Sequence, residues 1–545
     1  MPPLSQRPPL LPPALMVQGT CSNAGKSLLA AALCRIFARR GLNVAPFKAQ
    51  NMSLNSFVTE DGGEMGRAQA LQAMACGLEA DVRMNPVLLK PVNDKGSQVI
   101  VMGRPAGAMR ARDWAGSKAR LWRAVRAAYA ELARGRDIMI LEGAGSPAEI
   151  NLRRNDIVNM RMARHAGAHV ILVADIDRGG AFAAIVGTMR LLTPSERRLV
   201  CGFVLNKFRG DASLLAPAID RISAMTGKPF LGVVPWLDDL RLPEEDSVSF
   251  KLGLTPGLES ADARTDARES DAGTLDVAVI DLPRISNFTD LDALRLEDGI
   301  RLRRVARPDE LGAPDCVVLP GTRNTGGDAR FLEESGLFAA LQAYGLRCLN
   351  ERRGTLVGIC GGLQLLGTSV ADPAGLEEGG TIRGLGLLPI RTTLSPEKTL
   401  RRTKATADAA LAGGRTPAFG YEIHHGETQI DDAGARKAHP RMSARPVMRN
   451  EKGEPVGWAA AGSGGRARIW GTYLHGVFDA DAFRHAFCNA LRADRGLAPR
   501  EGRAYDTGPA IDRLADTVAR AVDTAALLSR LFPETALKFP AERPI

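Results

Sequence analysis

Residues 14–33 read A-L-M-V-Q-G-T-C-S-N-A-G-K-S-L-L-A-A-A-L. An apolar segment comes first, a loop bounded by Gly19 and Gly25 follows, and a segment rich in alanine and leucine begins near Lys26. This order predicts a strand, a loop and a helix. Backbone N–H groups of such a loop surround nucleotide phosphates, while Lys26 neutralises their charge and the hydroxyl of Ser27 binds Mg²⁺. A helix N-cap with incidental glycines is the alternative, but it would not need the lysine.

The spacing departs from the standard Walker A motif, because Thr20 occupies the usual glycine position and Gly19 lies one residue too early. The order G-T-x-S-x-x-G-K-S resembles that of dethiobiotin-synthetase-like amidoligases, which implies a P-loop domain with a parallel sheet. Residues 201–211, C-G-F-V-L-N-K-F-R-G-D, are similar to the Asn-Lys element that reads a purine base in this class. The resemblance implies ATP binding by Gly19, Thr20, Ser22, Asn23, Gly25, Lys26, Ser27 and, at the adenine, Asn206.

Two later segments place carboxylates at the ends of expected strands. Residues 137–141, D-I-M-I-L, lead into Glu142, and a run of similar apolar character leads into Asp175 and Asp177. Ligand and metal sites collect at the carboxyl ends of parallel strands. Glu142 is therefore predicted, with Ser27, to bind Mg²⁺ or to position water; the alternative is that it only caps a helix.

A second motif surrounds Cys360 and reads T-L-V-G-I-C-G-G-L-Q-L-L-G. Residues 355–357 predict a buried strand and residues 363–366 a helix, and the glycines between them permit a sharp turn. Such an elbow exposes the thiol in a cleft, and the helix N-terminus favours the thiolate and offers N–H groups to an oxyanion. Further along, G-T-Y-L-H-G places His475 as a candidate base.

These two segments resemble the class I glutamine amidotransferase domain, which has a flavodoxin-like α/β fold. The resemblance implies that Cys360 takes the acyl group of glutamine and that His475 activates it. It also assigns the oxyanion site to Gly361 and to Gly321, which follows the strand C-V-V-L-P. Many such domains carry an acid two positions after the histidine, where this chain has Val477. The chain is thus similar to the subgroup with a Cys-His dyad, and some other group must orient the imidazole.

Further motifs resemble the cobyric acid synthase family in the same order from about Val17 to Asp479. They include F-K-A-Q-N-M-S-L-N-S, G-R-A-Q-A-L-Q-A, L-E-G-A-G-S-P-A-E-I-N-L, D-I-V-N-M and G-Y-E-I-H-H-G. Members use ATP and glutamine to amidate the b, d, e and g carboxylates of adenosylcobyrinic a,c-diamide or of its hydrogenobyrinic counterpart. The resemblance therefore implies a corrinoid substrate. It also implies substrate or phosphate contacts from Lys48, Gln50, Asn51 and Asp156, although Asp156 could equally cap a helix.

The chemistry agrees with this reading. A carboxylate does not react with ammonia at neutral pH, so it must first become an acyl phosphate with ATP as donor. Three rivals remain: the a,c-diamide synthase of the same pathway, a partition-type or regulatory ATPase with an inert glutaminase-like module, and a free glutaminase with a nucleotide-sensing domain. The Q-N-M-S-L-N-S and A-E-I-N-L segments favour the four-amide enzyme, and the intact cysteine and histidine argue against inertness.

Composition indicates the number of domains and excludes several classes of protein. A chain of 545 residues, 45% hydrophobic and 24% charged, predicts two or three globular domains. No apolar run approaches the length of a membrane helix, and the proline-rich start is not a signal peptide. Eight cysteines without a C-x-x-C pair predict a reducing, cytoplasmic setting without structural zinc. The net charge of +10 is scattered, so nucleic acid binding is not expected. A homo-oligomer is compatible with the sequence.

The domain boundaries follow from composition. We expect a flexible arm, an amidoligase domain, a surface linker rich in Asp, Ala, Ser and Gly, a glutaminase domain and a helical tail. Their ranges are 1–14, 15–250, 251–274, 275–495 and 496–545. The tail is expected to pack on the glutaminase domain or on a partner subunit. His424 and His425 beside Glu422 suggest a metal, but neighbours on a strand point to opposite faces, so no metal site is expected there.

Overall fold

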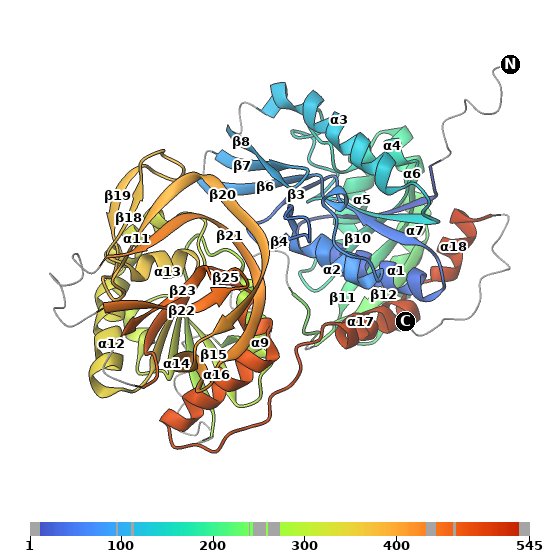
Figure 1. The fold of residues 1–545 in the computed structure, drawn as a ribbon. Coiled ribbons are helices and arrows are strands. Elements are labelled where there is room, and N and C mark those ends of the chain that lie inside the picture. Colours follow the sequence, from blue (N-terminus) through green and yellow to red (C-terminus); the bar gives the residue numbers. More distant parts are fainter. Residues whose placement is uncertain are drawn as a thin grey trace. The chain divides into compact units, whose positions relative to one another are not determined.

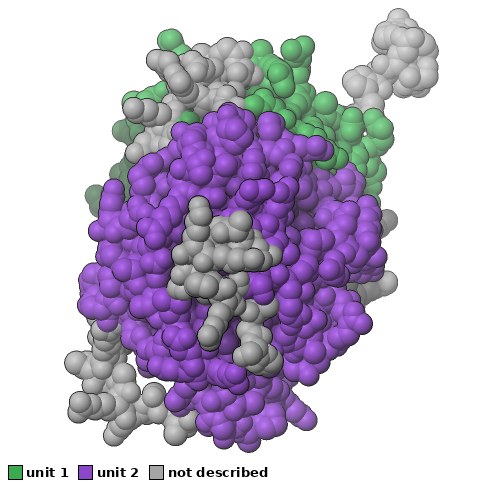
Figure 2. Space-filling view, turned by 60° about the vertical axis from the view of Figure 1, so that its left-hand side comes forward, with its two compact units in different colours: residues 1–53, 63–245, 506–545 green, residues 54–62, 246–505 purple. Residues whose placement is uncertain are grey.

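The structure is a computed structural model that describes residues 11–93, 96–110, 114–238, 240–243, 258–259, 273–431, 443–461 and 465–533. Most of the expected N-terminal arm and of the expected linker lies outside these residues. The chain forms two compact units, coloured separately in Figure 2. Unit 1 comprises residues 1–53, 63–245 and 506–545, and unit 2 comprises residues 54–62 and 246–505.

Unit 1 is built on a parallel sheet, as the sequence predicts. Its strands are ordered β12-β11-β10-β1-β9-β2, and each neighbouring pair is parallel. The apolar runs that form the central strands are buried on both faces, which is typical of parallel sheets. Their bounds are β1 (Ala14–Gly19), β2 (Val44–Phe47), β9 (Ile138–Glu142), β10 (His169–Asp175), β11 (Val200–Phe208) and β12 (Phe230–Pro235). Because β1 lies between β9 and β10, the carboxyl ends of these three strands meet around the phosphate loop.

Helices and a small second sheet complete unit 1 (Figure 1). The helices are α1 (Lys26–Arg39), α2 (Arg67–Ala75), η2 (Val82–Met84), α3 (Trp114–Leu132), α4 (Met160–Ala166), α5 (Ala181–Leu191), α6 (Pro194–Leu199), η4 (Ala212–Leu215) and α7 (Ala216–Thr226). The small sheet has the order β3-β6-β7-β8, with β3 (Gln50–Met52), β6 (Val87–Asn93), β7 (Gly96–Val101) and β8 (Arg104–Arg110). β5 (Glu64–Gly66) precedes α2.

The predicted tail belongs to unit 1 from Asp506 onward, so for this part the expectation that it packs on the glutaminase domain or on a partner subunit is wrong. It forms α17 (Gly508–Ala521) and α18 (Thr524–Leu531). α17 packs along α1, where Arg35 Nε donates to Asp512 Oδ1 at 2.7 Å. The amphipathic spacing shows that the helix has a buried face, but it does not identify the surface that the face covers.

Unit 2 contains a large mixed sheet with a parallel α/β part. β13 (Leu258–Glu259), β15 (Ile300–Val305), β14 (Leu275–Ile280), β16 (Cys316–Leu319), β17 (Thr355–Ile359) and β24 (Ile469–Thr472) are parallel in this order. This arrangement confirms the predicted α/β class. The sheet continues through β23 (Pro455–Ala461), β22 (Ser443–Asn450), β20 (Ile390–Ala407), β18 (Ser369–Asp372) and β19 (Gly380–Arg383).

A long antiparallel pair, β20 and β21 (Thr416–Ile430), curves along one side of unit 2 (Figure 1). β21 also pairs with the short β25 (Leu474–His475), and residues 56–58 form β4. The helices are η6 (Phe288–Leu291), α9 (Asp292–Arg295), α10 (Pro308–Leu311), α11 (Thr325–Glu334), α12 (Leu337–Glu351), α13 (Gly361–Leu366), α14 (Ala409–Ala412), η7 (Val477–Asp479) and α16 (Asp481–Asp494).

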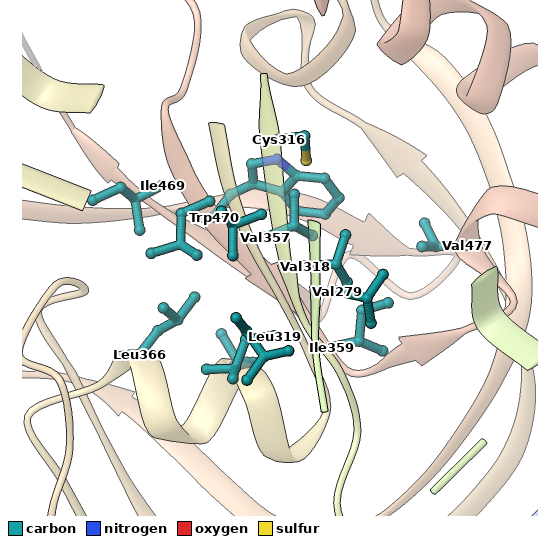
Figure 3. Packing of buried hydrophobic residues seen from close by; sticks show 14 of the residues in the cluster. Val279, Cys316, Val318, Leu319, Val357, Ile359, Leu366, Ile469, Trp470 and Val477 are labelled. Atoms are coloured by element: carbon teal, nitrogen blue, oxygen red, sulfur yellow. The ribbon is translucent and has the colours of Figure 1, made fainter. Parts of the chain in front are cut away.

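The core of unit 2 is centred on β16 and β17. Figure 3 shows Val357 beside the indole of Trp470 from the neighbouring strand, and Val318 and Ile359 in the same cluster. These side chains are fully buried. Such burial holds the end of β17, and therefore the cysteine that follows it, in a rigid frame. In the described part of both units, no helix is long and apolar enough to cross a membrane.

The tail should contribute to the stability of unit 1 through its apolar face. Leu514 of α17 is 2% exposed in the core that it shares with α1. We expect Leu514→Ala to lower the free energy of unfolding by about 2–5 kcal/mol, as other buried Leu→Ala changes do. Urea denaturation measures the change. Leu214→Ala is the matched control, since Leu214 is 77% exposed in the same unit, and it should change stability by less than about 0.5 kcal/mol. Equal effects would contradict the packing.

Candidate active sites

The phosphate loop follows β1 and is held by residues from the end of β11. Asn206 Nδ2 donates to the carbonyl of Ala24 at 2.9 Å, and Lys207 Nζ donates to the carbonyl of Asn23 at 2.7 Å. Lys207 also pairs with Asp175 at the end of β10, at 2.8 Å. The structure therefore brings the predicted Asn206 to the loop. Lys207 is an additional residue whose only sequence signal is its place in the Asn-Lys element.

Gly25 is required by the shape of this loop. Its φ of +94° lies in the left-handed region, and a Cβ there would overlap Asn206 Nδ2. Gly19 is also tightly placed, because a Cβ would meet the carbonyl of Cys21 at 2.8 Å. Thr20 continues the line of β1, with its N–H bonded to the carbonyl of Val173 at 2.9 Å. Ser22 follows in the same loop, as predicted.

The predicted phosphate-binding residues lie at the start of α1. Lys26 is 7% exposed, and its Nζ donates to the carbonyl of Cys21 at 2.9 Å, so the ammonium group lies over the loop. Ser27 Oγ donates to Glu142 Oε1 at 2.7 Å. The hydroxyl and the carboxylate predicted to act together are thus in direct contact, at the junction of α1 and β9.

Glu142 is the centre of a buried polar network. Its carboxylate is 1% exposed and accepts from Lys48 Nζ at 2.8 Å, from Gln69 Nε2 at 3.2 Å and from Gln72 Nε2 at 2.6 Å. Asn51 Nδ2 in turn donates to Gln69 Oε1 at 2.9 Å. One positive charge offsets the buried negative charge, and the amides satisfy its remaining lone pairs. These donors are side chains, whereas a helix cap would accept bonds from backbone N–H groups.

Sequence reasoning missed Gln69 and Gln72 as site residues. Their spacing of three on α2 places both amides on one face of the helix, and this signal was available in the sequence. Gln50, which was predicted, lies half-buried on β3 next to Asn51. The Ser27 hydroxyl and the Glu142 carboxylate are hard oxygen ligands of the kind that Mg²⁺ prefers, so these residues fit this ion.

The Asp156 carboxylate stabilises the turn before α4. Its Oδ1 accepts from the N–H groups of Val158 at 2.9 Å and Asn159 at 3.0 Å. Burial raises the pKa of this carboxyl, although backbone hydrogen bonds oppose the effect. The neighbouring Asn159 is better placed to shape the site, because its side chain bonds both the N–H and the carbonyl of Ala144, just after Glu142.

In unit 2, Cys360 occupies the predicted elbow between β17 and α13. Its φ of +51° and ψ of −105° are strained for a residue with a side chain. The turn is tight because a Cβ on Gly362 would overlap the carbonyl of Leu319. The thiol lies 3.6 Å from the carbonyl of Ile423, and the N–H of Cys360 donates to the carbonyl of Thr472. These bonds fix the sulfur beside the strand pair that carries the histidine.

His475 is oriented by Asp290, a residue that sequence reasoning did not name. The Nδ1 atom lies 2.7 Å from Asp290 Oδ2, and the N–H of Gly476 donates to Asp290 Oδ1 at 2.8 Å. Burial disfavours the imidazolium, but the charges of Asp290 and Cys360 outweigh it and raise the pKa of His475 to about 10. The acid absent at Val477 is therefore supplied by η6, 185 residues earlier in the chain. The expected Cys-His dyad is a triad in the structure.

The predicted oxyanion glycines both lie against this centre. A Cβ on Gly321 would lie 3.1 Å from the Cε1 atom of His475, so the loop after β16 reaches the imidazole. Gly361 is the first residue of α13, where backbone N–H groups have no acceptor within the helix. A Cβ on Gly361 would lie 2.5 Å from Thr322 Cγ2. The two glycine segments therefore converge at the elbow.

The histidines near Glu422 are used in structural contacts. His424 stacks on Tyr473 with ring centroids 3.7 Å apart, and its Nδ1 bonds the carbonyl of Gly426. His425 Nδ1 bonds the carbonyl of Ser395. Glu422 lies 2.7 Å from Arg401, and despite the opposing effect of burial, its hydrogen bonds to His424 and Arg401 lower its pKa to about 2.

Two family models match this chain, one in its N-terminal part and one in its C-terminal part. The family model described as "CobQ/CobB/MinD/ParA nucleotide binding domain" matches residues 15–250. The one described as "CobB/CobQ-like glutamine amidotransferase domain" matches residues 276–483. These matches confirm the predicted P-loop domain and the predicted class I glutaminase domain.

Similar proteins extend over nearly the whole chain. The cobyric acid synthase of Nitratidesulfovibrio vulgaris is 52% identical over 95% of this chain and 97% of its own length. That of Moorella thermoacetica is 48% identical over 94% of this chain and 96% of its own. The cobyric acid synthase of Sorangium cellulosum is 46% identical over 94% of this chain and 97% of its own length.

A nucleotide-binding domain and a glutamine amidotransferase domain in one chain define a glutamine-dependent amidoligase. The similarity over almost the full length is more specific than this class. The chain belongs to the cobyric acid synthase family. It is an amidating enzyme of cobalamin biosynthesis. The resemblance inferred from the sequence motifs is thereby confirmed.

The loop geometry predicts the effect of a small change at Gly25. We expect Gly25→Ala to weaken ATP binding at least about tenfold, because strain and overlap with Asn206 would displace the loop by enough to cost about 1.4 kcal/mol or more. Isothermal titration calorimetry measures the dissociation constant. Gly41→Ala is the matched control, since Gly41 has a φ of +82° in the same unit with nothing near its Cβ position. Equal losses in both variants would show that strain, not the contact, matters.

The triad predicts the effect of removing the acid. We expect Asp290→Asn to lower glutamine-dependent amidation about 100-fold or more, the range of general acid–base groups, while ammonia as nitrogen source restores product. Steady-state assays with both nitrogen sources measure this split. Asp309→Asn, which changes an exposed carboxylate of the same unit, is the control.

The same variant should show a defined pH dependence of stability. The pKa of His475 is raised from 6.5 to about 10. The pair of His475 and Asp290 therefore contributes fully to the free energy of unfolding below about pH 6.5, and this contribution is lost as the pH rises through about 10. The difference in unfolding free energy between wild type and Asp290→Asn should therefore shrink over this range. A difference that does not change with pH would contradict the ion pair.

Proposed function

We propose that the protein uses ATP and glutamine to amidate the b, d, e and g carboxylates of cobyrinic or hydrogenobyrinic a,c-diamide, giving cobyric acid or its counterpart. Family membership supports the reaction class. The observation that carries the proposal is the presence of two assembled sites in one chain. One is the Glu142 network beside the phosphate loop, and the other is the triad of Cys360, His475 and Asp290.

In unit 1, a carboxylate oxygen of the corrinoid attacks the γ-phosphorus of ATP, and ADP leaves. The acyl phosphate then reacts at its carbonyl carbon with ammonia, which forms the amide and releases inorganic phosphate. Lys26 neutralises phosphate charge at the loop, and Lys48 screens the approach of one anion to another. When bound, Mg²⁺ would be held by Ser27 and Glu142 and would supply further charge neutralisation.

The acceptor side of unit 1 is assigned to the residues around β3. Gln50 and Asn51 present amides that can bond carboxylate or amide groups of the corrinoid, next to Lys48. Asp156 contributes indirectly, because it caps the turn before α4 and so holds Asn159 on the Glu142 loop. This role replaces direct orientation of the acceptor by Asp156.

In unit 2, the Cys360 thiolate attacks the side-chain amide carbon of glutamine. The tetrahedral oxyanion receives N–H groups of the Gly321 and Gly361 segments, and His475 donates its proton to the departing ammonia. Water, deprotonated by the imidazole, then cleaves the thioester and releases glutamate. Asp290 keeps the imidazole in one tautomer and orientation throughout.

The a,c-diamide synthase reaction is the second candidate, because it shares both half-reactions and domain order. The intact triad disfavours a regulatory ATPase with an inert module. All eight cysteines are free, which agrees with the reducing cytoplasm. We propose no nucleic acid or membrane partner; a homo-oligomer is compatible with the structure.

Mass spectrometry tests the acceptor. We expect cobyrinic or hydrogenobyrinic a,c-diamide, incubated with the protein, ATP, Mg²⁺ and glutamine, to undergo four successive mass decreases, one for each hydroxyl exchanged for an amino group. Cys360→Ala should lose all four with glutamine and retain them with ammonium chloride, because only the nitrogen supply is removed. No decrease on the diamide but two on the unamidated acid would instead identify the a,c-diamide synthase.

A further inference from the structure

A short segment of the amidoligase half of the sequence is built into unit 2. The chain leaves unit 1 after Ser53, contributes Leu54–Gly62 to unit 2 and returns to unit 1 at Gly63. This excursion, which we name the inserted segment, lies within the stretch that matches the nucleotide-binding family.

The inserted segment packs on the strand that carries Tyr421. The rings of Phe57 and Tyr421 have centroids 6.0 Å apart, and Val58 is fully buried in a cluster with Tyr421 and Ile423. Arg402 fixes the segment from the neighbouring strand: its Nε donates to the carbonyl of Val58 at 3.1 Å, and its guanidinium lies 5.2 Å from the Phe57 ring centroid. The side chain of Phe57 is thus held in place by apolar and polar contacts.

Tyr421 connects this packing to the catalytic imidazole. Its ring is stacked on His475 with centroids 5.4 Å apart and planes inclined by 18°, and the two residues are partners in the pairing of β21 with β25. An aromatic face beside a protonated imidazole is electrostatically favourable. Phe57 therefore supports the ring that is stacked on His475.

A second contact of the inserted segment reaches the acid of the triad. The N–H of Ser56 donates to Asn287 Oδ1 at 2.9 Å. Asn287 begins η6 with a φ of +51°, and its carbonyl accepts from the N–H of Asp290 at 2.9 Å. The segment thus contacts the supports of both His475 and Asp290.

The other end of the inserted segment follows directly from the nucleotide site. β3 ends at Met52, and on it Asn51 bonds Gln69, which bonds Glu142. Only Ser53 and the segment's first residues separate this network from Phe57. A rearrangement of the Glu142 carboxylate on nucleotide binding would be transmitted to the segment through the backbone that both share.

We propose that Phe57 and Tyr421 are positioning residues for His475, and that the inserted segment makes glutamine hydrolysis respond to ATP at the Glu142 site. This inference rests on the proposed roles of His475 and Glu142. It gives the chain a means of withholding ammonia until an acyl phosphate can form. The segment acts through the geometry of the triad and contacts no reacting atom.

The test compares glutamine hydrolysis with and without ATP and Mg²⁺ in wild type and in Phe57→Ala. We expect ATP to stimulate wild type and the ratio to fall to near one in the variant. We also expect its kcat to fall about three- to tenfold, the contribution of one aromatic pair, with KM for glutamine unchanged. Phe419→Ala is the matched control, because Phe419 lies on the same strand and is 52% exposed; it should behave as wild type.

Two further variants keep the result interpretable. Tyr421→Phe retains the stacked ring and should retain hydrolysis, whereas Tyr421→Ala should match or exceed the loss in Phe57→Ala. Circular dichroism and thermal unfolding report whether unit 2 of each variant is folded. A full ATP response in folded Phe57→Ala, or no response in wild type, would overturn the inference. Hydrolysis that persists in Cys360→Ala would instead refute the proposed nucleophile, which is a separate failure.

Discussion

The buried carboxylate of Glu142 is the constraint on which the organisation of unit 1 depends. A carboxylate that is 1% exposed is costly unless it is paired and fully hydrogen-bonded. Its partners come from α1, from the chain after β2 and from one face of α2, so the charge is satisfied only when all of these elements have docked on the sheet. The same arrangement brings a hydroxyl, an ammonium group and a carboxylate to the end of β9, beside the phosphate loop. The requirement to satisfy the buried charge thus also assembles the groups that the proposed phosphoryl transfer needs.

Unit 2 also depends on a buried carboxylate that must be hydrogen-bonded, in this case that of Asp290. Asp290 is buried, and His475 together with the N–H of Gly476 satisfies its two oxygens. Burial disfavours the imidazolium, but interactions with this carboxylate and with Cys360 outweigh it and raise the pKa of His475. The strained backbone at Cys360 is retained for a related reason, since the close approach of Gly362 to the end of β16 leaves no room for a relaxed turn. Both features make the catalytic geometry a consequence of packing rather than of local sequence preference.

The contrast between predicted and missed residues has a physical cause. Lys26, Ser27 and Cys360 could be predicted because each lies in a strand–loop–helix segment whose chemistry is local in the sequence. Glu142 could be predicted because the ends of parallel strands share one edge of a sheet. Asp290 could not be, because it approaches His475 from 185 residues away, in a short helix with no distinctive pattern. The place of the tail was missed because amphipathicity reports that a face is buried and carries no information about its partner. Asp156, drawn from a family motif, stays a prediction as a substrate residue, since the bonds that its carboxylate accepts are those of a turn.

The inserted segment gives the two units covalent connections besides the linker. Domains that only share a linker can each form their own site, and their activities are then independent unless an interface couples them. Here the backbone that carries Asn51 in unit 1 continues within a few residues into the packing of Tyr421 and the turn before Asp290 in unit 2. A glutaminase unit cut at the linker before Leu275 would therefore lack Phe57 and Val58 and would expose the apolar cluster around Tyr421. The segment contacts Tyr421, which stacks on His475, and Asn287, which lies just before Asp290. Chain within the stretch that matches the nucleotide-binding family therefore packs against two neighbours of the triad. In the coupling that we propose, this covalent continuity links the glutaminase site to the nucleotide site.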